Sequence, residues 1–552
     1  MVTIKNTKNF YRVCSLLLLG VIVLISIWSL ISLRKNTMLY YDEITDLMPM
    51  PYIRNGCGSF QSLSATRLDI HCWPIINGIL YQGSLRGYLL LPLILLGKLT
   101  PTSVAVFSFA LLILCGFIIY KIGKQLGYSD GLSLLISITF ISLPIVWTNV
   151  LYDLGPVTIQ LLVRTALLLS IFKDIKRGRF SSRITVALAV LLIWGKMDGI
   201  WFVSSAITGS FIIQILVQRK ISFIKSATDY MYVVVVTFTF VISMIVTKFQ
   251  GADQFNIDIF MKLRGQIPTN FSVGTLPIPY NVDFSRFLFF GQLLSPILII
   301  SAILTLVVVR INTQTKLLEK FIYLTAIQTL IIYIFIIITP RATAPWHTVS
   351  LMPSGLFPFI YVVSKLRLQF LRIFTHLHIP NKIYKIYSLT GPIVLVLAFI
   401  SISTFNLALY TDIKNTKPKA LSSVSLISRI IEITDESSKD VAIVFTSWGL
   451  YNSTIIDSRA NLEVQGYIYD GWPWYKDSFT IADTKTQVWL YSEGPLKTYR
   501  RFIFVGIDGA PGSTGIEVEK QIQAANLCLV DSQSYVVGSD RRRLTVSRAS
   551  KC

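Results

Sequence analysis

The chain has 552 residues, of which 53% are hydrophobic and only 14% are charged. A mean hydropathy of +0.60 excludes an ordinary soluble protein and indicates a membrane protein with several crossings. The net charge of +22 does not predict a nucleic-acid partner, because most Lys and Arg lie in short segments between apolar runs, where they set membrane topology.

The first apolar run, residues 13–33, is followed closely by an acidic cluster. The run is long enough to cross about 30 Å of hydrocarbon, and no small-residue cleavage site follows it, so we expect an uncleaved signal anchor. Basic residues before the run place the N-terminus in the cytoplasm. Asp42 and Glu43 then lie either in a solvated loop or close enough to the bilayer to meet a lipid-borne substrate.

Hydropathy and the positions of basic residues predict about eleven crossings, with the N-terminus inside and the C-terminus outside. The expected fold is a polytopic α-helical membrane domain over residues 1–410, with a large first external loop at 34–86. The expected crossings are near residues 13–33, 101–120, 130–151, 158–172, 184–195, 200–217, 227–247, 286–309, 321–339, 349–364 and 388–410.

Residues 184–217 form one apolar stretch that is too long for a single straight crossing. Both flanks are basic and belong on the cytoplasmic side, so the chain must turn back at GKMDG, residues 195–199. Two short helices are therefore expected, with Lys196 and Asp198 at the hairpin tip on the outer face. Residues 87–98 are too few to span, and they are expected to form a helix along the outer interface.

Several basic side chains are expected on the outer face, near the height of the phosphate headgroups. Arg86, Lys196 and Arg341 each either anchor a helix end by snorkelling or bind a phosphate. His347 either caps a helix or contacts the acceptor or the phosphate. Together with the acidic pair after the first crossing, these residues describe a site for a lipid phosphate and a hydroxyl.

Arg164 interrupts an apolar helix in the fourth expected crossing. An arginine inside the membrane is costly without a partner, and Asp153 in the preceding turn is the expected partner. A structural ion pair and a contact with substrate both remain open for this residue.

Four of the six cysteines lie in segments expected outside the cytoplasm. Cys57 and Cys72 share the first loop, and Cys528 and Cys552 share the C-terminal segment, so either pair could be oxidised. Neither a CxxC motif nor a suitable His/Cys spacing is present, and no metal or cofactor is expected.

The composition becomes soluble from about residue 411, which predicts an extracytoplasmic α/β domain over residues 411–552. Its basic end, residues 540–551, is expected to be a solvated tail, with contact to anionic lipid as the alternative. Strands are expected at 441–447, 486–492 and 502–507, and helices at 422–436 and 517–526.

Four short motifs between residues 10 and 410 resemble those of the GT-C superfamily of membrane glycosyltransferases, which includes the protein O-mannosyltransferases and the aminoarabinose transferases of lipid A. The motifs are YYDEITD (40–46), YQGSLRGYLLLPLILLGKLTP (81–101), GKMDG (195–199) and PRATAPWHTVSLMP (340–353).

This resemblance implies an enzyme that moves a sugar from a polyprenyl or dolichyl phosphate to a lipid, glycan or protein acceptor on the extracytoplasmic side. It implies a multi-pass protein of the bacterial inner membrane, with Asp42 as the base and Glu43 in support. The implied substrate-binding residues are Tyr81, Arg86, Asp153, Lys196, Asp198, Arg341 and His347. The alternatives are a transporter or lipid flippase, which would place polar residues near the midplane, and a non-catalytic membrane scaffold.

Overall fold

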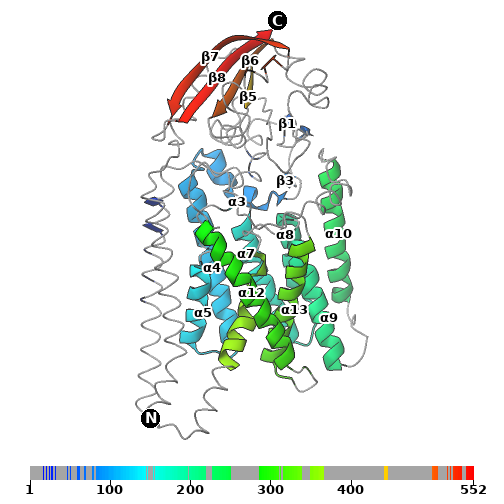
Figure 1. The fold of residues 1–552 in the computed structure, drawn as a ribbon. Coiled ribbons are helices and arrows are strands. Elements are labelled where there is room, and N and C mark those ends of the chain that lie inside the picture. Colours follow the sequence, from blue (N-terminus) through cyan, green and yellow to red (C-terminus); the bar gives the residue numbers. More distant parts are fainter. Residues whose placement is uncertain are drawn as a thin grey trace.

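The computed structural model of the chain consists of a helical bundle and a β-sheet (Figure 1). One expected crossing, residues 388–410, lies outside the described residues, and only isolated helical residues are described within 13–33. The structure describes residues 82–143, 156–196, 198–218, 227–249, 285–309, 315–338, 349–365, 441–445, 500–507, 526–537 and 542–552, together with short stretches and isolated residues between them.

Eight helices of the bundle coincide with apolar runs that were expected to cross the membrane. Three of the described helices, within Pro101–Gln125, Gly199–Leu216 and Leu317–Ile337, are long and apolar enough to do so. The structure therefore confirms a helical protein with candidate membrane spans, whereas the total of about eleven stays a prediction. The eight helices are α4 (Pro101–Gln125), α5 (Asp130–Ser142), α7 (Val157–Lys176), α8 (Arg183–Gly195), α9 (Gly199–Gln218), α10 (Ala227–Phe249), α12 (Ser285–Val308) and α13 (Leu317–Ile338).

Local sequence sets the ends of several helices. Thr100 and Ser103 form a capping box at the start of α4, where each side chain accepts a backbone N–H of the other. The side chain of Ser182 accepts the N–H of Thr185 and caps α8. The long stretch at 184–217 is broken at the GKMDG motif, where α8 ends and α9 begins. The prediction of a helical hairpin is confirmed.

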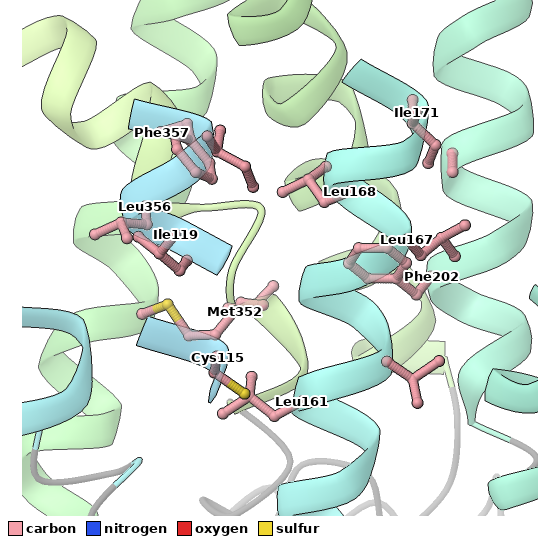
Figure 2. Close-up of a cluster of buried hydrophobic side chains, with 14 of the residues drawn as sticks. Cys115, Ile119, Leu161, Leu167, Leu168, Ile171, Phe202, Met352, Leu356 and Phe357 are labelled. Atoms are coloured by element: carbon pink, nitrogen blue, oxygen red, sulfur yellow. The ribbon is translucent and has the colours of Figure 1, made fainter. Parts of the chain in front are cut away.

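Helix α7 lies inside the bundle, in contact with α4, α8 and α13. Figure 2 shows Leu161 of α7 beside Cys115 of α4, and Leu167 of α7 beside Phe202 of α9. Because α7 is buried around most of its circumference, polar side chains on it must find partners within the protein.

Helix α3 (Leu85–Leu95) precedes the bundle and corresponds to the expected interfacial helix. Leu90 and Ile94 are buried, whereas Leu89 is 50% exposed and Leu96, just beyond the helix, is 68% exposed. A short helix with an apolar exposed face is suited to a membrane interface. Figure 1 shows α3, strand β3 (Asn77–Ile79) and the C-terminal sheet on the same side of the bundle.

The C-terminal segment contains a four-stranded sheet. The expected strands near 441–447 and 502–507 are confirmed, and 486–492 lies outside the described residues. The strand order is β5-β6-β8-β7; β5 and β6 are parallel, and the other two pairings are antiparallel. A separate domain beginning at residue 411 stays a prediction. The strands are β5 (Val441–Phe445), β6 (Arg501–Ile507), β7 (Leu527–Val537) and β8 (Arg542–Lys551).

The prediction of a solvated basic tail at residues 540–551 is wrong. Residues 542–551 of this segment form β8, which pairs with β6 on one side and with β7 on the other. Val546 and Ala549 are buried, and Arg548 pairs with Asp531 of β7 at 2.8 Å. The arginines made this strand look like a solvated tail in the sequence. The partner that neutralises Arg548 lies 17 residues away, so it could not be recognised from the local sequence.

Cys528 and Cys552 form a disulfide that joins β7 to the end of β8, as expected for one of the two candidate pairs. Cys57 and Cys72 lie outside the described residues.

Removing this disulfide is expected to destabilise the C-terminal sheet. The crosslink closes a loop with a sequence separation of 24, and closing a loop of this size contributes about 3 kcal/mol. In thermal unfolding, reductant should lower the melting temperature of the wild type but not that of the Cys528→Ser/Cys552→Ser double variant. Cys115→Ala is the control and should retain the response to reductant. A wild type that ignores reductant would contradict the prediction.

Candidate functional site

The predicted polar residues that the structure describes, Arg86, Asp153, Lys196 and Asp198, lie on or next to α3, α7 and the α8–α9 hairpin tip. α8 contacts both α3 and strand β4 (Gln82–Gly83). The approach is close: a Cβ added to Gly83 would lie 1.9 Å from the backbone oxygen of Trp194. Gly83 is thus required for strand β4 to lie against the end of α8.

Arg86 and Asp153 form a fully buried ion pair, with 2.8 Å between Nη1 and Oδ2 and no exposed side-chain surface on either residue. Asp153 accepts three further hydrogen bonds. The Ser108 hydroxyl donates to Oδ2 at 3.1 Å, and the backbone N–H and hydroxyl of Thr158 both donate to Oδ1. A carboxylate with these partners is well compensated, and it ties α3, α4 and the start of α7 together.

The predicted pairing of Arg164 with Asp153 is wrong. Arg164 Nη2 lies 3.4 Å from Oδ2 of Asp198, at the tip of the α8–α9 hairpin. The reason is depth: Arg164 lies about 10 Å inside α7, whereas Asp153 precedes the helix and is held by Arg86. The sequence predicted that Arg164 has a carboxylate partner, but it did not identify Asp198 as that partner.

Lys196 occupies the residue after α8, with an extended backbone, and only 7% of it is exposed. Within the described part of the chain, its ammonium group has no hydrogen-bond or ion-pair partner. A snorkelling side chain keeps its charged group in water, so this interpretation does not fit Arg86, whose side chain is fully buried, whereas for Lys196 both interpretations stay predictions.

Gln160 was not singled out by the sequence. It lies one turn before Arg164 on α7, is 1% exposed, and donates from Nε2 to the backbone oxygen of Leu192 at 3.1 Å. A polar side chain four residues from a buried arginine on the same helix face was the signal that could have found it.

Three buried polar atoms near the hairpin tip have no hydrogen-bond partner among the described residues: Gln160 Oε1, Arg164 Nε and Asp198 Oδ1. Leaving such an atom unpaired costs about 1–3 kcal/mol, so most proteins avoid it. These three unpaired atoms distinguish the group of Gln160, Arg164 and Asp198 from the Asp153 network, in which both carboxylate oxygens are hydrogen-bonded.

Five predicted site residues lie outside the described residues: Asp42, Glu43, Tyr81, Arg341 and His347. Their placement around a common site stays a prediction. Among the described residues, no group of three His, Cys, Asp or Glu side chains could hold a metal ion.

The comparisons with known proteins reveal similarity in structure. No protein-family model matches the sequence, and no curated protein matches it. Two crystal structures of ArnT from Cupriavidus metallidurans match, one in the apo state and one bound to undecaprenyl phosphate. Each has a TM-score of 0.54 and 12% identity, and the alignment covers 96% of this chain and 97% of that chain. The chain therefore has the fold of ArnT, which confirms at the level of fold the resemblance to GT-C glycosyltransferases.

Proposed function

We propose that the protein is a membrane glycosyltransferase that moves a sugar from a polyprenyl or dolichyl phosphate to an acceptor on the extracytoplasmic side. The observation that carries this proposal is the position of Lys196: the residue lies at the hairpin tip, is only 7% exposed, and has no ion-pair partner among the described residues. The fold supports it, because one of the ArnT structures with this fold is bound to undecaprenyl phosphate.

Lys196 fits the chemistry of a departing lipid phosphate. Burying an ammonium group costs several kcal/mol unless an anion compensates it. A phosphate provides that anion, and the negative charge on its bridging oxygen grows as the bond to the sugar breaks. A cation held in a water-poor position before the reaction therefore stabilises the transition state more than the bound donor.

In the proposed reaction, the oxygen of the acceptor hydroxyl forms a bond to the anomeric carbon. The bond from that carbon to the lipid phosphate oxygen breaks, and its electron pair remains on the phosphate. The hydroxyl proton passes to the carboxylate of Asp42, with Glu43 in support. Tyr81, Arg341 and His347 are proposed to contact the donor or the acceptor. For Arg86 and Asp153 we propose a structural role, because each already has its partner.

The first test compares the glycans and glycolipids of the cell envelope with and without the gene, by mass spectrometry. Loss of one glycosylated product on deletion is the expected result, and the product identifies the sugar and the acceptor. An unchanged envelope would instead favour the scaffold. Proton-coupled uptake by the purified protein in liposomes would favour the transporter.

Asp42→Asn is expected to lower the amount of this product by about 100-fold, because the amide cannot accept the hydroxyl proton. The variant should reach the membrane in wild-type amounts and unfold at the wild-type temperature. Glu43→Gln is the matched control and should have the smaller effect. Near-normal product from a cell carrying Asp42→Asn would remove Asp42 as the base.

A further inference from the structure

The α8–α9 hairpin tip is held against α7 at two points that lie one helical turn apart. Gln160 donates to the backbone oxygen of Leu192 at the end of α8, at 3.1 Å. Arg164 pairs with Asp198 just before the start of α9, at 3.4 Å. Lys196 lies in the chain between these two points, so side chains of α7 determine where its backbone sits.

The tip itself is a tight turn. The backbone N–H of Gly199 donates to the oxygen of Lys196 at 2.9 Å, and the N–H of Trp201 donates to the oxygen of Asp198 at 3.0 Å. The first bond joins Lys196 to Gly199 and the second joins Asp198 to Trp201, so Lys196 and Asp198 belong to the same hydrogen-bonded turn at the start of α9. A displacement of Asp198 therefore carries Lys196 with it.

Arg164 and Asp198 use only half of the contact that their side chains can make. A guanidinium and a carboxylate can form two parallel hydrogen bonds, which fix orientation as well as distance. Here Nη2 faces Oδ2, while Nε and Oδ1 are both buried without a partner. Nε is the second donor and Oδ1 the second acceptor that a two-bond contact between this guanidinium and this carboxylate would use. Lysine, a point charge, lacks this planar geometry.

We propose that Arg164 is a positioning residue, which sets the place of Lys196 against the lipid phosphate by holding Asp198. The inference rests on the function proposed above. Neither Arg164 nor Asp198 needs to touch the phosphate, because their effect passes through the hairpin tip. Asp198, expected from the sequence to bind substrate, is assigned to this indirect role.

Binding of undecaprenyl phosphate to the purified full-length protein tests the proposal. The readout is the affinity obtained from the ligand-induced rise in melting temperature. Arg164→Lys keeps the charge but loses the fork, and it is expected to weaken binding about tenfold, or about 1.4 kcal/mol. Lys124→Met is the control. It removes an exposed ion pair with Asp130 at the end of α4 and should leave the affinity unchanged.

A double variant shows whether Arg164 acts by positioning Lys196 or contacts the lipid phosphate independently. If Arg164 acts through Lys196, then Arg164→Lys has no further effect on binding in a Lys196→Met protein. Additive losses would overturn the proposal, and so would wild-type affinity in Arg164→Lys. Should Arg164→Lys fail to fold, Asp198→Asn takes its place in the same cycle with the same expected coupling.

The result also separates this inference from the proposed function. A wild-type protein that does not bind undecaprenyl phosphate contradicts the lipid-phosphate donor, and with it both proposals. A wild-type protein that binds the lipid through Lys196, but is indifferent to Arg164 and Asp198, contradicts the positioning role alone. An effect of Arg164→Lys on melting temperature without an effect on affinity assigns the pair a purely structural role.

Discussion

Replacing Asp153 with alanine is expected to destabilise the protein by about 3–5 kcal/mol, because the change leaves the buried Arg86 guanidinium without its anion. The hydroxyl of Ser108 and the N–H of Thr158 lose their acceptors at the same time. α3 and α7 should then separate more easily. Thermal unfolding in detergent, followed by tryptophan fluorescence, measures the loss.

The control for this prediction removes both charges together. In Arg86→Met/Asp153→Asn neither charge of this pair remains, the asparagine oxygen can still accept from Thr158, and its amide nitrogen can donate to the hydroxyl of Ser108, which can also accept. This double variant should be more stable than Asp153→Ala. If both proteins lose the same stability, the ion pair is not what holds the three elements together.

The same pair of variants decides the role of Arg86, which the sequence placed among the phosphate-binding candidates. A structural arginine predicts that the double variant retains affinity for undecaprenyl phosphate. If Arg86 itself holds the phosphate, affinity falls even where the fold is kept. The fully buried position of Arg86, with Asp153 at 2.8 Å, favours the structural role.

The helices could be predicted because hydropathy depends only on local sequence. The hairpin at 195–199 followed from length and charge: a stretch with basic residues on both flanks must return to the side on which it began. The helices and the hairpin both depend on residues that are neighbours in the chain, and both predictions are confirmed for the described helices.

The partners of the buried charges could not be predicted in this way. Arg164 could reach either of two carboxylates in the sequence, Asp153 or Asp198. The choice depends on how deeply the hairpin tip lies against α7 and on which arginine already holds Asp153. The depth of the hairpin tip and the partner of Asp153 are both set by tertiary packing, and tertiary packing cannot be read from hydropathy.

Strand β8 was missed for a related reason. Its arginines suggested a solvated tail, but Arg548 is neutralised by Asp531, and the apolar Val546 and Ala549 are both buried. A strand between two others depends on pairing with distant segments, and β-propensity reflects that context more than the residues themselves.

Lys196→Met is expected to separate activity from stability. The glycosylated product should fall by about 10²–10³-fold, the typical cost of losing one group that stabilises developing negative charge. Stability should not fall, and it should rise if the buried ammonium is uncompensated in the free protein, because methionine fills similar space without a charge. Mass spectrometry of the product and thermal unfolding of the purified protein measure the two effects.

Lys196→Arg is the matched control for this prediction, because it keeps a cation at the hairpin tip. It should yield more product than Lys196→Met, although the larger guanidinium must fit into a position that is only 7% exposed. A Lys196→Met protein that melts below the wild type would show that Lys196 supports the fold. Full product from that variant would remove the cation from the reaction. Loss of product with unchanged or higher stability is the combination expected of a charge that the free protein carries at a cost and that the substrate phosphate compensates.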